Sequence, residues 1–258
     1  MRTSRRLLLP TLGLVLALVT GCGGDDEPDA RAPGSTITTA EAKVLSGVLY
    51  QDFRSGGADF TLSAPYAESA TITLTGQVDF RRGVGSAHAV TDFSNGQADE
   101  SRTLFFTGDQ LWFGDVPGLA DALTAAGLPA ASYVKRPIST TSATGTASLI
   151  DVLVQLVPRL SARSADDPRS FSENGWTWTG NSSVGGALTS VFSNGRGTSI
   201  AVDAKDHELV QYATKLPDQA FTVTITLSDH GDRQITLPAD ADTLDATAHP
   251  DVAGKVGV

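Results

Sequence analysis

Cysteine occurs only once in this chain of 258 residues, at position 22. A single cysteine excludes an intramolecular disulfide, a CxxC redox pair and a multi-cysteine zinc site. Lys and Trp are also scarce, whereas Ser, Thr and Gly are abundant, and this bias favours β-structure over long helices. A chain of this length buries roughly 70% of its unfolded surface, so it can fold without a disulfide or a structural metal, either as one large domain or as two small ones.

Basic clusters and catalytic signatures are missing as well. The formal net charge is −10, which argues against nucleic acid as a partner because phosphate binding needs clustered Lys and Arg. The sequence contains neither GxSxG nor HExxH, and it has no phosphate-binding glycine loop between a strand and a helix. The four histidines show no metal-ligand spacing, and we expect each to lie on the surface: His88, His207, His230 and His249.

We interpret the acidic clusters as surface charge rather than as catalytic groups. Residues 25–27 and 166–167 lack the spacing of a calcium loop and are predicted to be solvated. Asp99 and Glu100 are neighbours along the chain, and neighbouring residues of a strand point to opposite faces. We therefore expect no enzyme activity, no metal and no cofactor.

The N-terminus predicts a lipoprotein signal. Three arginines precede an apolar run over residues 7–19, which is short for a membrane span of about 20 residues. An ordinary secretory peptide or a short membrane anchor is the alternative. The lone cysteine follows Val19-Thr20-Gly21 and so resembles the lipobox of bacterial lipoproteins. That resemblance implies cleavage before Cys22 and a diacylglyceryl thioether on it, and two acyl chains anchor a protein durably.

Cleavage would leave a more acidic chain. Removing 21 residues that carry three arginines and no acid leaves 237 residues and changes the net charge from −10 to −13. We predict a signal peptide over 1–21, the lipidated Cys22 with a flexible tether over 22–36, and one domain over 37–258. The tether contains no large apolar residue and cannot join a core. The predicted location is the extracytoplasmic face of the cell membrane, where lipid rather than charge holds the protein.

Strands with short turns dominate the domain. Thr38 or Thr39 can cap a helix over 39–54, and helices are also expected over 118–126 and 147–160, the last ending or kinking at Pro158. Residues 71–80 alternate strictly between apolar and polar. Similar signals predict roughly ten strands: 60–64, 71–80, 84–93, 101–106, 110–113, 132–138, 176–178, 199–202, 209–216, 221–227 and 234–238. Tight turns make this an antiparallel meander of the α+β class.

Four segments, taken in order, resemble the LppX/LprA/LprF/LprG group of actinobacterial lipoproteins and, more broadly, the LolA/LolB-like superfamily. They are the lipobox with its acidic tether, the amphipathic strand 71–80 after an opening helix, the hairpin 108–113 before a helical insertion, and 221–238 as a closing hairpin. The hairpin predicted over residues 202–210 adds to the likeness. Two segments depart from the group's pattern, residues 132–137 and residues 176–178. The resemblance implies a strongly curved antiparallel sheet, or half-open β-barrel, with helices packed on its concave face.

The resemblance also implies a hydrophobic cavity that holds acyl chains of a lipid or glycolipid, for carriage or transfer across the cell envelope. A membrane transporter or an envelope protein is then a possible partner. The inward faces of the strands and the long helix supply the candidate lining: Ile72, Leu74, Val78, Phe80, Leu104, Phe106, Leu149, Leu153, Leu156, Val223, Ile225 and Leu227. The same residues would equally fill a solid core, and the sequence leaves both possibilities open.

Two other functions stay open at this point. The same fold could serve as an envelope sensor or protein-interaction module without lipid cargo, and its acidic surface would then need a basic partner. An envelope enzyme would require a pocket with at least two titratable groups of shifted pKa.

Overall fold

The computed structural model of this chain describes residues 31–139, 148–216 and 221–258. The contacts divide the chain after Arg31, and the second unit, Ala32–Val258, holds all the strands and helices of these residues. The predicted signal peptide and Cys22 lie outside the described residues.

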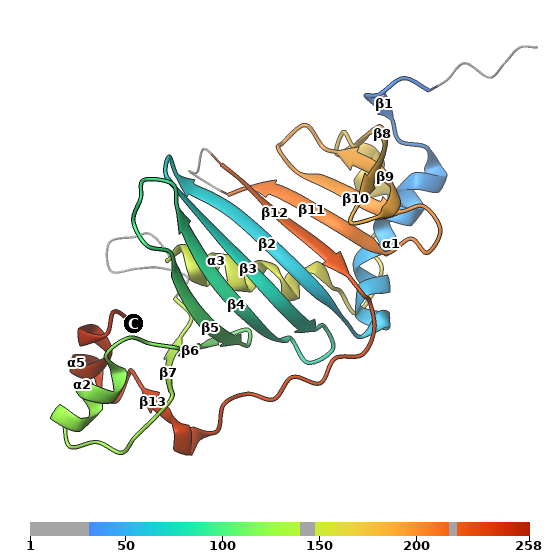
Figure 1. Cartoon of the computed structure of the whole chain (residues 1–258). Helices are drawn as coiled ribbons and strands as arrows, with labels where there is room; N and C mark the ends of the chain where they lie inside the picture. Colours follow the sequence, from blue (N-terminus) through green and yellow to red (C-terminus); the bar gives the residue numbers. More distant parts are fainter. Residues whose placement is uncertain (1–30, 140–147, 217–220) are drawn as a thin grey trace, which may run out of the picture. The chain divides into compact units, whose positions relative to one another are not determined.

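One large curved sheet forms the framework of this unit (Figure 1). Its thirteen described strands are ordered β1-β8-β9-β10-β11-β12-β2-β3-β4-β5-β6-β7-β13, and the two end strands do not pair with each other. In chain order they are β1 Ser35–Thr36, β2 Gly57–Ala67, β3 Ala70–Asp79, β4 Val84–Phe93, β5 Glu100–Phe106, β6 Gln110–Gly114, β7 Tyr133–Pro137, β8 Thr177–Val184, β9 Ala187–Ser193, β10 Ser199–Asp203, β11 Leu209–Lys215, β12 Thr222–Ser228 and β13 Thr243–Asp245.

Five α-helices accompany the sheet in the described part of the chain: α1 Thr39–Ser55, α2 Leu119–Ala125, α3 Leu149–Leu156, α4 Pro168–Glu173 and α5 Pro250–Lys255. Two short 3-10 turns, η1 Pro158–Leu160 and η2 Asp240–Asp242, complete the elements. The capping signal at the start of α1 is confirmed, because Thr38 and Glu41 form a reciprocal capping box. Pro158 ends α3 as expected, and the chain continues there as η1.

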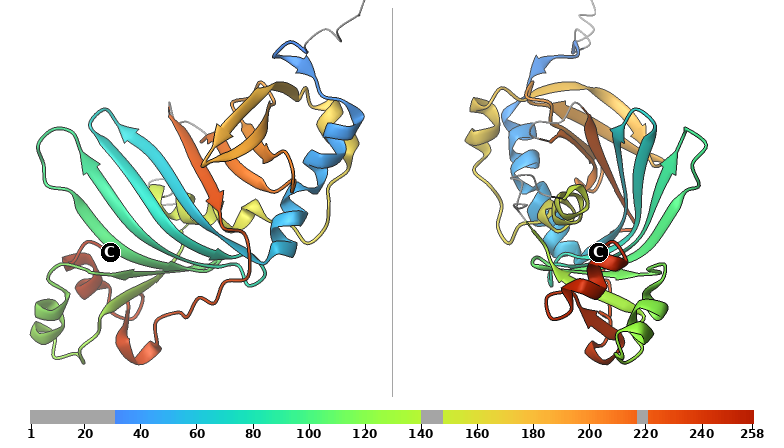
Figure 2. Two further views of the ribbon diagram at one scale, coloured as in Figure 1. Left: turned by 45° about the vertical axis from the view of Figure 1, so that its right-hand side comes forward. Right: turned by 90° about the vertical axis from the view of Figure 1, so that its left-hand side faces the viewer.

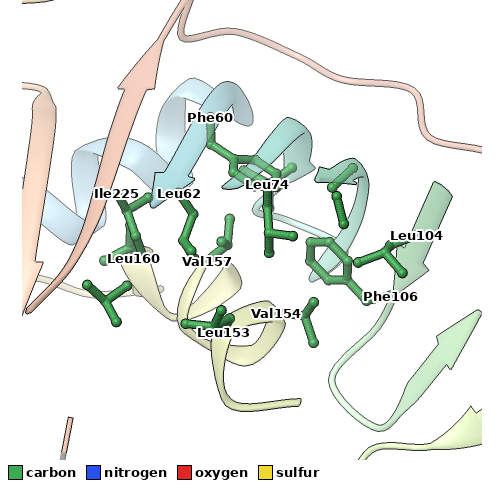
Figure 3. Close-up of a cluster of buried hydrophobic side chains, with 14 of the residues drawn as sticks. Phe60, Leu62, Leu74, Leu104, Phe106, Leu153, Val154, Val157, Leu160 and Ile225 are labelled. Atoms are coloured by element: carbon green, nitrogen blue, oxygen red, sulfur yellow. The ribbon is translucent and has the colours of Figure 1, made fainter. Parts of the chain in front are cut away.

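Helix α3 shares the hydrophobic core with the inward faces of the central strands. Figure 3 shows Leu153, Val154 and Val157 opposite Leu62 and Phe106, and all five side chains are at most 1% exposed. Phe60 packs edge-on against Phe106 at 6.3 Å between ring centroids. Helix α1 adds Leu45 and Val48 to the same cluster. Each fully buried leucine or phenylalanine contributes about 1.5–3 kcal/mol to folding, so this cluster is the main source of stability.

The sheet has more strands than the sequence predicts. The structure has thirteen strands rather than about ten, because β1, β9 and β13 carry weak or short patterns. β1 uses Ser35 and Thr36, the last residues of the expected tether, which pair with β8. The α4 and α5 helices, six residues each, were also not predicted. Pairing is antiparallel except between β7 and β13, which run parallel.

The expected closing hairpin is wrong in its second half, since residues 234–238 form no strand. The alternation there has another cause. Ile235 is buried at 5% exposure, while its carbonyl accepts a hydrogen bond from Arg82 Nη1 at 3.1 Å instead of joining a ladder. Burial of alternate residues therefore does not require a strand here.

Candidate functional site

An apolar pocket lies between α1, η1, α4 and the strands β10 and β11. Its volume is about 220 Å³, and it is partly open to solvent. Three groups of residues supply most of its wall: Leu45, Val48 and Leu49 from α1; Leu156, Arg159 and Leu160 from the end of α3 and from η1; and Ile200, Leu209 and Tyr212 from β10 and β11. Phe171 of α4 completes the wall.

Local sequence rules place these side chains together. Val48 and Leu49 follow Leu45 by three and four residues, so all three share one face of α1. Ile200 and Tyr212 are direct partners in the antiparallel ladder of β10 and β11, so both face the same side of the sheet. The two polar groups in the wall are Arg159, which hydrogen-bonds Gln155 at 3.0 Å, and the half-buried Tyr212.

Most of the twelve predicted lining residues lie in the hydrophobic core rather than on the wall of the apolar pocket. Nine are buried at 4% exposure or less: Leu74, Val78, Phe80, Leu104, Phe106, Leu153, Val223, Ile225 and Leu227. Ile72, Leu149 and Leu156 are half-buried and pack against the core. Of the twelve, Leu156 lies on the wall of the apolar pocket. Sequence reasoning missed the contributions of α1, α4, β10 and β11.

A second, polar pocket of about 230 Å³ lies at the end of β12. Asp203, Asp206, Glu208, Asp229 and His230 line it, and it contains more acidic groups than the apolar pocket. Two of these residues, Glu208 and His230, also lie beside the buried Asp52, and we call these three side chains the Asp52 cluster.

The histidine of the Asp52 cluster lies between two carboxylates. His230 Nε2 is 3.5 Å from Asp52 Oδ1, and His230 Nδ1 is 3.4 Å from Glu208 Oε2. The side chain of Asp52 is fully buried and that of His230 is 7% exposed. Asp52 also accepts a hydrogen bond from the backbone N–H of Leu209, while Asp52 Oδ2 and His230 Nε2 have no hydrogen-bond partner in the described residues.

Burial and charge shift both pKa values in this cluster. Burial raises the pKa of Asp52 to about 6, although the nearby imidazole of His230 and its positive charge act in the opposite direction. Burial acts to lower the pKa of His230, but the attraction of Asp52 and Glu208 outweighs it, so the net pKa is raised. In the polar pocket, the backbone N–H of Asp206 lowers the pKa of Asp203.

The Asp52 cluster connects separate segments of the fold. Each imidazole nitrogen of His230 faces a carboxylate. The contacts join the last turn of α1 to β11 and to the residues after β12. The expectation that His230 lies on the surface is wrong, because α1 covers this turn. His88 and His207 are exposed as expected.

No cluster of three or more His, Cys, Asp or Glu side chains in the described residues has the arrangement of a metal site. Across the same residues, no helix combines the length and the apolar character that crossing a membrane requires.

No protein-family model matches this sequence, and no curated protein matches it. Solved structures are similar in fold. LprF from Mycobacterium bovis is 11% identical, with 80% of this chain and 99% of that chain covered and a TM-score of 0.45. An uncharacterized conserved protein from Thermus thermophilus is 8% identical, with 80% and 99% covered and a TM-score of 0.37.

A chain of the MucA/MucB complex of Pseudomonas aeruginosa is 13% identical, with 78% of this chain and 59% of that chain covered and a TM-score of 0.33. LprF is a member of the lipoprotein group that the sequence resembles. All three TM-scores lie below 0.5.

Proposed function

We propose that this protein is a membrane-anchored extracytoplasmic lipoprotein that binds the acyl chain of a lipid or glycolipid and carries it in the cell envelope. The observation that supports this most directly is the apolar pocket, in which eight of the ten lining side chains are Leu, Ile, Val or Phe. Shielding a chain from water stabilises binding by about 0.8 kcal/mol per methylene, and no catalytic group is needed.

The size of the pocket restricts the ligand. Its volume of about 220 Å³ lies below the range of roughly 300–1,000 Å³ that is common for small-molecule sites. We therefore propose that it takes one acyl chain, and that its opening to solvent leaves the head group outside. Helices α1 and α3 would close the concave side of the sheet over the chain (Figure 2).

The anchor rests on the sequence alone. A lipid on Cys22 would hold the protein at the membrane surface, where a carrier can exchange its cargo with the bilayer. The folded domain is acidic and has few basic residues to attract anionic head groups, so it would not bind the membrane surface by charge.

A titration with a fluorescent fatty acid tests the proposal. The wild-type domain should bind the probe at one site, and Leu156→Trp should weaken binding about ten-fold or more, because the larger ring fills the pocket. Leu188→Trp is the matched control, since Leu188 is 63% exposed on β9. Equal binding by all three proteins, or no binding by any, would contradict the proposed site. The second of these results would favour an interaction module without cargo.

A further inference from the structure

A third pocket of about 240 Å³ lies beside the C-terminal turn of α1 and is lined by three arginines. Arg81 and Arg82 come from the turn between β3 and β4, and Arg163 follows η1. Phe53 forms part of the wall, and no acidic residue is among the lining side chains. Three arginines in one pocket are unexpected in a chain whose formal net charge is −10. We call this the basic pocket.

The positive charge of the basic pocket is only partly compensated by the protein. Arg81 pairs with Asp232 at 2.6 Å, but this aspartate is 78% exposed. Arg82 is 3.9 Å from Asp79, beyond hydrogen-bond distance. The Arg163 guanidinium lies 6.0 Å from the centre of the Phe53 ring, and no carboxylate in the described residues forms an ion pair with it. One positive charge therefore remains without a counter-charge, beside two others that face the same space.

The basic pocket and the apolar pocket have lining residues on neighbouring turns of α1. Leu49 lines the apolar pocket and Phe53 the basic one, one helical turn later, which is about 6 Å along the axis. The same holds for the segment after α3, where Leu160 faces the apolar pocket and Ser161 the basic one. The backbone N–H of Ala162 donates to Leu49 O at 2.9 Å, so this segment is fixed against α1.

We propose that the basic pocket binds the phosphate of a lipid head group while the acyl chain of the same molecule occupies the apolar pocket. This inference rests on the proposed function and names its ligand class as a phosphate-bearing lipid. Arginine is suited to this role because its planar fork matches phosphate oxygens and keeps its charge at every physiological pH. The side chains of Arg81 and Arg82 are 49% and 56% exposed, so a head group can reach them from solvent.

A free phosphate ion has the same chemistry as the phosphate of a lipid head group. Three probes distinguish these two candidate ligands. Lauroyl lysophosphatidic acid carries one chain and one phosphate, monolaurin carries the same chain without a phosphate, and inorganic phosphate carries no chain. Binding of each to the wild-type protein is measured by calorimetry at low and at moderate salt. The phosphorylated lipid should bind more tightly than monolaurin, and only its affinity should fall with salt, because exposed charges are screened.

Arg163→Gln is the informative variant, since Arg163 is exposed and forms no ion pair with any other described residue. It should weaken binding of the phosphorylated lipid about five-fold, the upper end for an exposed charge pair, and leave monolaurin unchanged. Arg169→Gln is the matched control, because Arg169 lies on α4, carries the same charge and lines neither pocket.

Each result decides between the two proposals. Equal affinity for the phosphorylated and the neutral lipid, or equal effects of both arginine variants, would overturn the head-group site and leave acyl binding intact. Binding of inorganic phosphate as tight as that of the phosphorylated lipid would overturn the joint site, because the chain would then add nothing. Failure of both lipids to bind would overturn the proposed function as well.

Discussion

Asp52 Oδ1 lies 3.5 Å from His230 Nε2, and this contact fastens the last turn of α1 to the residues that follow β12. The same helix carries Leu45, Val48 and Leu49 into the apolar pocket. Leu209, which donates its backbone N–H to Asp52, also lines that pocket. The Asp52 cluster therefore sets the position of one pocket wall, and its protonation affects the stability of the fold.

The first prediction concerns the pH dependence of stability. Burial raises the pKa of Asp52 from 3.8 to about 6, so the folded state keeps a proton that the unfolded state releases. Stability from this group is present below pH 4 and is lost as the pH rises to about 6. Relative to Asp52→Asn, the wild-type free energy of unfolding should fall by about 3 kcal/mol across this window. Urea unfolding at several pH values measures it.

Asp229→Asn is the control for this experiment, because Asp229 is an exposed neighbour of His230. Its free energy of unfolding should follow that of the wild type at every pH. His230 has a raised pKa, so its own contribution is lost only at a pH above its ordinary value of 6.5. A wild-type curve parallel to that of Asp52→Asn between pH 4 and 6 would contradict the account.

A second prediction concerns the ion pair between Arg136 of β7 and Asp151 of α3. Two hydrogen bonds of 2.9 and 2.7 Å join the guanidinium to the carboxylate, and Asp151 is 1% exposed. Asp151→Ala should lower the free energy of unfolding by about 3 kcal/mol, because it leaves Arg136 without its partner. Asp121→Ala, in the first turn of α2 and exposed, should cost well under 1 kcal/mol. A similar loss of unfolding free energy in both variants would mean that the buried ion pair does not stabilise the fold more than an exposed aspartate does.

The third prediction contrasts two glycines. A Cβ at Gly76 of β3 would lie 1.9 Å from Ser86 O, a backbone atom of the neighbouring strand β4 that cannot move alone. Gly76→Ala should therefore destabilise the fold by about 3 kcal/mol. A Cβ at Gly47 of α1 meets nothing within 4 Å, so Gly47→Ala should stabilise it by up to about 1 kcal/mol. Thermal unfolding of both variants gives the comparison, and a neutral Gly76→Ala would be inconsistent with this register.

The sequence predicts those helices and strands whose capping residues and apolar periodicity are both contained in the segment itself. The Thr38 cap and the apolar stripe that follows it predict helix α1, and the alternation of residues 71–80 predicts strand β3. Local patterns fail where the structure depends on distant segments. Strand β13 exists because β7 offers it a parallel edge, and Ile235 is buried without a strand.

The candidate site was predicted only in part, for a related reason. Periodicity identifies which side chains point inward, and nine of the twelve proposed lining residues are indeed buried. Whether an inward face meets a helix or a space depends on the position of α1 and α4, which periodicity does not report. One available signal was missed: Asp52 continues the stripe of Leu45, Val48 and Leu49, and an aspartate on an apolar helix face indicates a buried partner.

The fourth prediction tests the anchor. Cys22→Ala should move the protein from the detergent phase to the aqueous phase in a detergent-partition experiment on whole cells, because the acyl chains would no longer be attached. Gly24→Ala, two residues further on, should leave the partition unchanged. Retention of the Cys22→Ala protein in the detergent phase would show that another feature holds it at the membrane.

Lipid binding by the folded domain is the central claim, and native mass spectrometry of protein purified from membranes measures it most directly. We predict a complex with one lipid per chain, lost on organic extraction, regained on addition of lauroyl lysophosphatidic acid, and much reduced in Leu156→Trp. Wild-type protein that carries no lipid after gentle purification and takes up none on addition would contradict the account.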